Sequence, residues 1–375
     1  MFVALVLVWP HAPAAALSTG MYAYEMTEDS LLHIDAHGIN TTVGKVGLSQ
    51  RFLPVAGQCA VAQETATMYV LAAKATNDSE TVLVGISLAD ASITAEVETP
   101  LRQLGLPEIG LGMTIDASAA GLVVLTGVDR LSDKHTAYAV DPSKGHVRKL
   151  SDGFLADARY AHDSNTSHAN PTSLSSRLLW SELCVDSAEL DFAHCLDVRS
   201  SVFWLTSPSR NYSESGLFDL VGVDVLKGAE VARHTMCNQM AAACDKGVPH
   251  VHAMAHDAST GGLLALGLNA SSLTPFVFTI DTAAFEARVV ARFEAFSAFN
   301  GIAAWDAKRR ALYGLAMKSE AVQDPVLIGY SMAAEAMIGP VDLCIGGSGC
   351  TAPVILGFFD APDARSVTLR GSVEA

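Results

Sequence analysis

Short apolar runs alternate with polar turns along most of the chain, and one arrangement of them returns several times. In this first pattern an apolar run ends at an Asp, a few small or polar residues follow, and a second apolar run begins. Short apolar runs bounded by turn-forming residues are typical of β-strands. The copies read MTIDASAAGLVVLTG from Met113, MAHDASTGGLLALGL from Met254, IAAWDAKRRALYGLA from Ile302 and LGFFDAPDARSVTLRG from Leu356, and a weaker copy, CAVAQETATMYVLAA from Cys59, has Glu64 in place of the Asp.

A second strand–turn–strand pattern follows the first in most units. Its copies read LLHIDAHGINTTVGKVG from Leu31, VLVGISLADASITAEVE from Val82, TAYAVDPSKGHVRKL from Thr136, LVGVDVLKGAEVARH from Leu220 and FVFTIDTAAFEARVV from Phe276. The first pattern repeats at steps of 49 to 54 residues, as from Asp257 to Asp306 and from Asp306 to Asp360. Four antiparallel strands at this spacing form the blade of a β-propeller. The sequence therefore predicts an all-β fold of about six four-stranded blades.

The two ends of the repeat complement each other. The first unit, near Met21 to Gly47, lacks its opening strand, and the segment from Val354 to Leu369 supplies strands with no later partners. Pairing the N- and C-terminal strands in one blade closes the ring and removes two exposed edges. We predict that closure. The rhythm breaks between Ala156 and Pro208, where we expect an insertion loop near residues 157–190. In the alternative, this region supplies two central strands of a seventh blade.

The repeated Asp residues have a local explanation. An Asp carboxylate accepts hydrogen bonds from backbone amides two residues later and so closes a tight turn. We predict this role for Asp116, Asp257, Asp306 and Asp360, at the rim of each blade and not in the central channel. The strand rhythm resembles the β-propeller superfamily, which includes WD-repeat, quinoprotein-like and lactonase-like members. The resemblance covers nearly all of the mature chain, identifies no narrower family and does not extend to WD repeats, since Trp305-Asp306 falls on a different strand pair.

The N-terminus and the glycosylation motifs indicate export. Phe2 to Trp9 is an unbroken apolar run, and Pro10, Pro13 and three Ala residues follow, so residues 1–16 are predicted to be a signal peptide. We expect one propeller domain over residues 17–375, no membrane span, and a secreted protein in the extracellular space or secretory lumen. Asn-x-Ser/Thr motifs predict glycosylation at Asn40, Asn77, Asn165, Asn211 and Asn269.

Six of the seven cysteines lie in closely spaced pairs, as expected for disulfides in an oxidising compartment. The predicted pairs are Cys184 with Cys195, Cys237 with Cys244, and Cys344 with Cys350. Cys59 is left over and is predicted to be a buried thiol. The net charge of −16 argues against nucleic acid as a partner, because phosphate binding needs clustered Lys and Arg. Self-repulsion of an acidic surface favours a monomer.

Two groups of residues are candidate sites. His250, His252, Met254 and His256 alternate along one stretch, and His250 with His252 could share a metal ion on one strand face. Glu108, Asn238 and Asn300 precede innermost strands, at the channel mouth where lactonase-like enzymes hold calcium; the resemblance implies a calcium site there. Histidines packed between blades are the simpler interpretation. Nucleophile-elbow, zinc-protease, P-loop and dinucleotide-binding motifs are absent.

Three functions follow, in order of preference. The first is a binding module for a protein or glycan ligand, without catalysis and without a cofactor. The second is a calcium-dependent, lactonase-like hydrolase, and the third is a redox or quinoprotein-like propeller. Propellers host unrelated functions, so the fold does not decide among these three.

Overall fold

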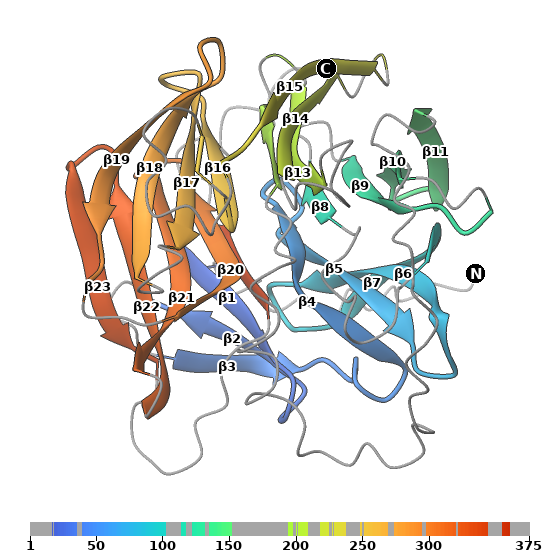
Figure 1. Cartoon of the computed structure of the whole chain (residues 1–375). Helices are drawn as coiled ribbons and strands as arrows, with labels where there is room; N and C mark the ends of the chain where they lie inside the picture. The colour runs from blue at the N-terminus through green and yellow to red at the C-terminus, as the bar shows by residue number, and fades with distance from the viewer. Residues whose placement is uncertain are drawn as a thin grey trace, which may run out of the picture.

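A computed structural model of the chain consists of strands and turns, with no helix in its described part. The described residues are 17, 19–35, 40–102, 114–117, 122–131, 135–151, 194–197, 200, 202–208, 218–224, 227, 229–237, 248–249, 251–268, 274–294, 298–319, 322–343 and 355–360. Their 24 strands form six antiparallel sheets of four strands each, arranged around a common centre (Figure 1). The predicted all-β propeller is confirmed.

Each sheet is one blade, named here from blade 1 to blade 6 along the chain. Blade 1 contains β24 (Ile355–Phe359), β1 (Gly20–Glu25), β2 (Ser30–Ile34) and β3 (Asn40–Lys45). Blade 2 contains β4 (Phe52–Ala62), β5 (Thr67–Lys74), β6 (Asn77–Ser87) and β7 (Ile93–Arg102). Blade 3 contains β8 (Thr114–Ala117), β9 (Val123–Val128), β10 (His135–Asp141) and β11 (His146–Ser151).

The other three blades have the same order of strands. Blade 4 contains β12 (His194–Asp197), β13 (Val202–Pro208), β14 (Phe218–Asp224) and β15 (Ala229–Thr235). Blade 5 contains β16 (Ala253–Asp257), β17 (Gly262–Leu268), β18 (Pro275–Asp281) and β19 (Glu286–Arg292). Blade 6 contains β20 (Ala298–Asp306), β21 (Ala311–Ser319), β22 (Val322–Ser331) and β23 (Ala336–Asp342).

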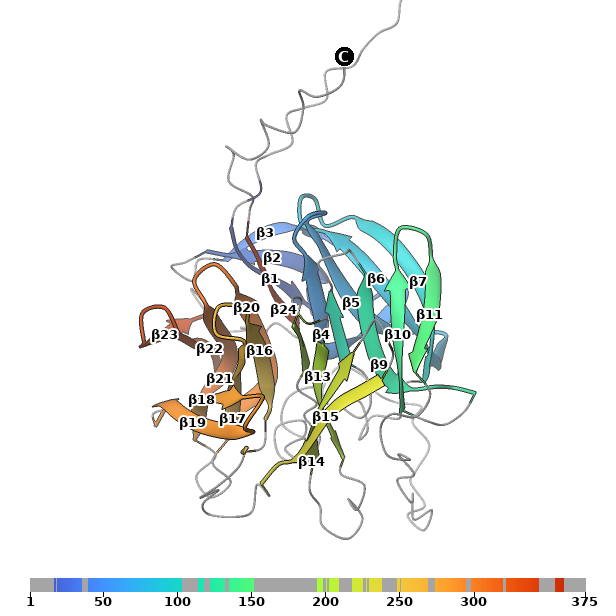
Figure 2. The same ribbon diagram turned by 90° about the horizontal axis from the view of Figure 1, so that it is seen from above.

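The ring is closed by the two ends of the repeat, as predicted. β24 pairs antiparallel with β1, with Met21 opposite Phe358 and Ala23 opposite Leu356. It is the innermost strand of blade 1 and lies between β1 and the neighbouring β4 (Figure 2). Gly357 allows this close approach, because a Cβ atom at that position would come within 2.5 Å of Val61 in β4. One strand from each end of the chain therefore completes a single sheet.

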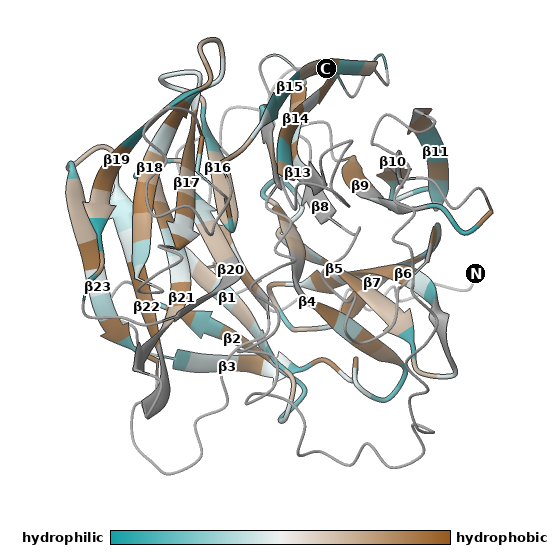
Figure 3. Cartoon of the chain, in the orientation of Figure 1, coloured by the Kyte–Doolittle hydropathy of each residue, from teal (hydrophilic) through white to brown (hydrophobic). Residues whose placement is uncertain are grey.

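Burial falls from the centre of the blades outward. All seven residues of β14 are buried, whereas the outermost strands β19 and β23 are mostly exposed or half-buried. Hydropathy follows the same trend, with polar and apolar bands alternating along β19 (Figure 3). Apolar side chains of adjacent blades pack face to face; for example, Tyr24 of blade 1 shares a cluster with Met68 of blade 2. Each blade therefore buries its faces against its neighbours.

A β-bulge recurs in every blade between the third and fourth strands. The register shifts at Leu31/Leu32, Gly85/Ile86, Ala137/Tyr138, Gly222/Val223, Val277/Phe278 and Leu327/Gly329. A bulge adds one residue to one strand and increases the local twist. The repeat of the backbone is thus more regular than the repeat of the sequence.

The hairpin turns share one chemistry. Asp257 accepts hydrogen bonds from the backbone amide and the hydroxyl of Ser259, and Asp306 accepts one from the Arg309 amide. These two predicted turn-formers are confirmed. Seven four-residue turns of the described part end at a residue with positive φ, and these residues are Asp29 (50°), Ala66 (48°), Gly145 (65°), Gly261 (75°), Phe285 (53°), Arg310 (50°) and Glu335 (48°). The Asp116 side chain lies outside the described part, and Asp360 is followed by residues that also lie outside it.

The seventh blade and one disulfide are corrected by the structure. His194–Asp197, which the alternative assigned to an extra blade, is the innermost strand of blade 4, so the described strands form six blades. Cys195 in that strand is a buried thiol and not half of a disulfide with Cys184. Its side chain packs into the apolar cluster between blades 4 and 5. The insertion near 157–190 lies outside the described residues.

The predicted glycosylation motifs and the remaining predicted disulfides lie only partly within the described residues. Asn40 is exposed at the start of β3, and its Nδ2 donates to the Leu343 carbonyl at 2.9 Å; Asn77 begins β6. Cys237 is disulfide-bonded. The predicted signal peptide, three further sequons and four of the paired cysteines lie outside the described residues; they are residues 1–16, Asn165, Asn211, Asn269, Cys184, Cys244, Cys344 and Cys350. No helix in the described part has the length and hydrophobicity needed to cross a membrane.

Candidate axial cavity

A cavity of about 550 Å³ lies inside the ring of innermost strands. Five of the six blades contribute to its wall through β4, β12, β16, β20 and β24. The wall also includes the turns that follow β16 and β20, so the cavity lies toward the ends of these strands. Small side chains make the room, since Ala60, Ala255, Ala303, Ala304 and Ala307 all line it.

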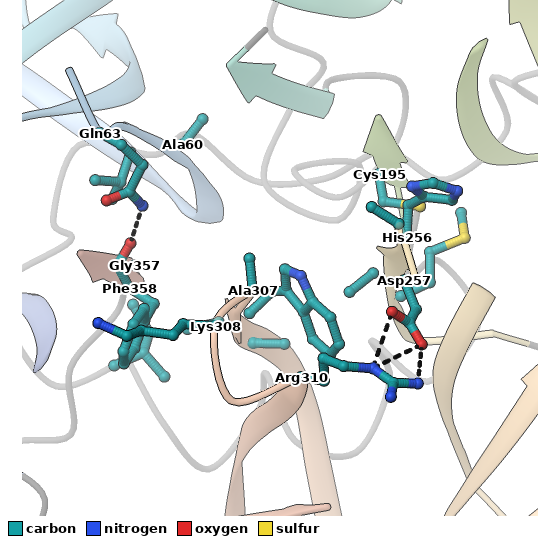
Figure 4. A pocket seen from close by; sticks show the side chains of 18 of the residues that line it. Ala60, Gln63, Cys195, His256, Asp257, Ala307, Lys308, Arg310, Gly357 and Phe358 are labelled. Carbon is teal, nitrogen blue, oxygen red and sulfur yellow. Dashed lines mark hydrogen bonds and ion pairs between the residues drawn. The ribbon is translucent and has the colours of Figure 1, made fainter. Parts of the chain in front are cut away.

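The wall has an apolar part and a polar part. Met254, Trp305, Leu356 and Phe358 supply apolar surface from three strands. The polar groups come from the last residues of the strands and from the turns, as the labelled side chains in Figure 4 show. They are Gln63, His256, Asp257, Ser259, Lys308 and Arg310.

Asp257 and Arg310 form an ion pair between blades 5 and 6. The Arg310 Nη2 lies 2.6 Å from Asp257 Oδ2, and Arg310 Nε lies 3.2 Å from both carboxylate oxygens. Asp257 is only 3% exposed. Burial by itself raises the pKa of Asp257, but hydrogen bonds from Arg310, Ser259 and Thr260 outweigh burial and hold the pKa at about 2. The carboxylate is therefore fully ionised at neutral pH.

Gln63 joins blades 2 and 1 with both ends of its amide. Its Nε2 donates to the Phe358 carbonyl at 2.9 Å, and the Asp360 backbone amide donates to its Oε1 at 2.8 Å. Cys59, four residues earlier in β4, adds a third contact between these blades, because its thiol donates to the Leu356 carbonyl at 3.1 Å. Cys59 is a thiol, as predicted, but it is half-buried on the cavity wall.

Two further contacts join neighbouring blades. Lys308 Nζ in blade 6 lies 3.8 Å from Asp360 Oδ1, just beyond β24 of blade 1. His256 Nε2 in blade 5 lies 3.4 Å from Asp197 Oδ1 in blade 4. Together with the Asp257–Arg310 and Gln63 contacts, they connect blades 4, 5, 6, 1 and 2 in sequence. Polar contacts thus tie the cavity end of five consecutive blades together.

The predicted site residues are placed only in part. His252 is buried, at 2% exposure, immediately before β16, but His250 lies outside the described residues, so a metal site shared by the two stays a prediction. Asn300 belongs to β20 with a side chain outside the described part, and Glu108 and Asn238 lie outside it altogether. Among described residues, no three His, Cys, Asp or Glu side chains are grouped to hold a metal ion. The calcium site is therefore a prediction that the structure does not test.

Sequence reasoning assigned the turns to the blade rims and missed their second role. Asp257 closes its turn as predicted, yet it also lines the cavity, because the turn between the first and second strands lies nearest the axis. Lys308 and Arg310 were missed as well. A signal for them existed in the sequence, since Lys308-Arg309-Arg310 is a run of three basic residues in an acidic chain.

The fold and the cavity define the protein as a six-bladed β-propeller with an axial cavity. No known family model matches the sequence, and no curated protein does. A chain in the crystal structure of a nidogen/laminin complex is similar, with a TM-score of 0.50 and 11% identity, covering 86% of this chain and 92% of that one. TolB from Acinetobacter baumannii has a TM-score of 0.49 and 10% identity, covering 86% of this chain and 63% of that one. At 11% identity, the similarity to the chain of the nidogen/laminin complex shows the fold alone.

Proposed function

We propose that this propeller is a secreted, glycosylated binding module that takes a protruding segment of a partner protein into its axial cavity. The observation that carries the proposal is the cavity itself. Its volume of about 550 Å³ falls within the range of roughly 300–1,000 Å³ that is usual for ligand sites. Its apolar wall with a few polar groups at one end is the usual composition of such a site.

The charged groups of the cavity favour binding over catalysis. A general acid or base works best with a pKa near the operating pH. The only carboxylate on the described wall is Asp257, whose pKa is about 2 because Arg310 and the turn hydroxyls stabilise its ionised form. Its proton affinity is too low for proton transfer near neutral pH. The carboxylate instead fixes Arg310 at the cavity wall.

The geometry of the wall favours a protein segment as the ligand. Five blades contribute, so a chain segment entering along the axis contacts several strands at once. One similar structure is that of a nidogen/laminin complex, an assembly of two proteins, which also supports protein binding. The sequons support a secreted location, and the exposure of Asn40 on an outermost strand supports its glycosylation.

Blocking the cavity tests the proposal. Ala307 lines the cavity and is exposed on the turn after β20, so Ala307→Trp fills the space without changing the packed core. Ala334→Trp is the matched control, because Ala334 is equally exposed on the outer turn of the same blade and does not line the cavity. The probe is an array of immobilised heptapeptides of varied sequence. Melting temperatures of both variants verify folding.

We expect a subset of the peptides to bind the unmodified protein and Ala334→Trp equally. Ala307→Trp should bind them at least about tenfold more weakly, a change equivalent to the loss of one well-packed contact region. The proposal fails when no peptide binds, and it fails equally when Ala307→Trp binds as tightly as Ala334→Trp.

A further inference from the structure

We infer that the cavity takes a proline-containing segment of the partner in the polyproline II conformation, and that Trp305 is the residue that recognises it. This inference rests on the proposed function and specifies the kind of segment that the cavity accepts. Trp305 supplies a flat apolar surface for a proline ring and an N–H donor for a backbone carbonyl. Aromatic side chains are the usual platform for such segments in other binding modules.

Trp305 supplies the accessible aromatic surface of the cavity wall. Two aromatic side chains line the described wall, and Phe358 is only 5% exposed, whereas Trp305 is half-buried. The buried part of Trp305 packs against the apolar cluster between blades 5 and 6. Because that packing fixes the side chain, a ligand that contacts its accessible part does not have to order it.

The Trp305 indole N–H is available as a donor. Within the described part of the chain, no hydrogen bond engages its Nε1. This nitrogen is also not enclosed, since the buried polar atoms without a partner are ring nitrogens of three histidines. An indole N–H only donates, and a buried one usually has an acceptor. The complementary ligand group is therefore a carbonyl oxygen.

The acceptors described on the wall, in contrast, are already engaged. The Asp257 carboxylate accepts from Arg310 and from the hydroxyls of its own turn, and Gln63 Oε1 accepts from a backbone amide at the end of β24. The carbonyls of Leu356 and Phe358 accept from side chains of β4. A ligand with backbone carbonyls and few N–H groups suits this wall, and proline has a carbonyl but no N–H.

The size of the cavity agrees with one turn of such a segment. The cavity of about 550 Å³ has the volume of a sphere about 10 Å across, and three residues of polyproline II span about 9 Å. An α-helix with its side chains is about 10–12 Å wide and would leave no space at the wall. Polyproline II makes no internal hydrogen bonds, so its carbonyls remain available to the protein.

The test compares matched peptides on matched variants. The peptides of the array are sorted by proline content, and the tightest binder is resynthesised with Ala or with N-methylalanine at each proline. Ala restores an N–H and backbone freedom, whereas N-methylalanine lacks the N–H but has no ring. Each peptide is titrated against the unmodified protein, Trp305→Phe and Trp204→Phe. Both substitutions replace an indole by a phenyl ring, but Trp204 packs between blades 4 and 5 and does not line the cavity.

We expect bound peptides to contain proline more often than the array as a whole. Replacement of the critical proline by Ala should weaken binding about tenfold, because an N–H without an acceptor enters the cavity and the free peptide becomes less ordered. N-methylalanine should cost about threefold, since it restores only the missing N–H. Trp305→Phe should weaken the proline peptide about fivefold and Trp204→Phe by no more than about twofold. Melting temperatures of both variants verify folding.

Proline and Ala peptides that bind equally well would overturn the inference, as would binders without proline or equal losses in Trp305→Phe and Trp204→Phe. Peptide binding that is sensitive to Ala307→Trp but indifferent to proline overturns this inference alone and leaves the proposed function standing. Preferential binding of a neutral oligosaccharide over every peptide overturns both.

Discussion

Two turns of blade 5 use the same chemistry at different distances from the axis. Asp257 and Asp281 each end a strand, and each accepts hydrogen bonds from the following backbone amides. Each stands four residues before a residue with positive φ, Gly261 in one turn and Phe285 in the other. In sequence the two turns are near-equivalents, and local rules assign both the same role.

Their surroundings differ completely. Asp257 is 3% exposed, pairs with Arg310 of the next blade and lines the axial cavity. Asp281 is exposed, and its recorded bonds are to the amides of its own turn. The blade thus uses one turn motif twice, and the distance from the axis decides whether it also joins blades. The comparison shows that the role of a turn residue in this fold depends on its distance from the propeller axis as well as on the local sequence.

The largest expected effect comes from removing the Asp257 carboxylate, with removal of the Asp281 carboxylate as the comparison. Asp257→Ala leaves Arg310 partly buried without its partner, and breaking such a pair should cost about 3 kcal/mol of the free energy of unfolding. Asp281→Ala loses only hydrogen bonds at a solvated turn, so its cost should be much smaller. Chemical denaturation of both variants measures the difference. Equal losses of stability would show that the stabilising effect of Asp257 comes from its own turn and not from the ion pair between blades.

The pH dependence of stability sharpens the same comparison. The pKa of Asp257 is about 2 in the folded protein, below its ordinary value, so its stabilising effect is fully present above about pH 4 and is lost as the pH falls toward 2. Asp257→Asn removes this titration. The difference in melting temperature between the unmodified protein and Asp257→Asn should therefore be largest at neutral pH and shrink below pH 4. A difference that stays constant from pH 7 to pH 2.5 would contradict the pairing with Arg310.

The sequence predicted the architecture because its determinants are local and repeat. Apolar runs, turn-forming Asp residues and a step of about fifty residues recur along the chain, and each unit packs mainly on its neighbours. The closure of the ring by β24 could also be predicted, because the first unit lacks a strand and the last unit has one too many, and pairing them leaves no exposed edge. The six bulges did not follow, because a register shift inside a hairpin leaves no consistent mark in the sequence.

The cavity was beyond reach of the same reasoning. Gln63, Asp257, Lys308 and Arg310 come from three turns separated by long stretches of chain, and each looks like an ordinary turn residue. Arg310 reaches Asp257, 53 residues earlier in the chain, only because blades 5 and 6 pack side by side. The predicted histidines were chosen for their alternation along one strand, and the structure shows that such alternation places His256 against Asp197 between blades. Side chains that meet across blades are not encoded by local patterns.

The smallest expected effect comes from Glu335, which shares its backbone conformation with Arg310 of the same blade. Arg310 and Glu335 end the inner and the outer turn, with φ of 50° and 48°. A side chain is disfavoured in this left-handed region, whereas glycine adopts it readily. Glu335 is exposed and its side chain makes no interaction with the residues that the structure describes, so Glu335→Gly should raise the free energy of unfolding by up to about 1 kcal/mol.

Arg310→Gly relieves the same backbone strain but should destabilise the protein, because Asp257 then loses the guanidinium that neutralises its buried charge. If the change in the free energy of unfolding has opposite signs for Gly at these two positions, the difference measures the contribution of the Asp257–Arg310 ion pair apart from that of the backbone conformation. Denaturation midpoints of the two variants, with Ala334→Gly as a control for added flexibility alone, provide the measurement. Stabilisation by both substitutions would contradict the role of Arg310 in holding blades 5 and 6 together.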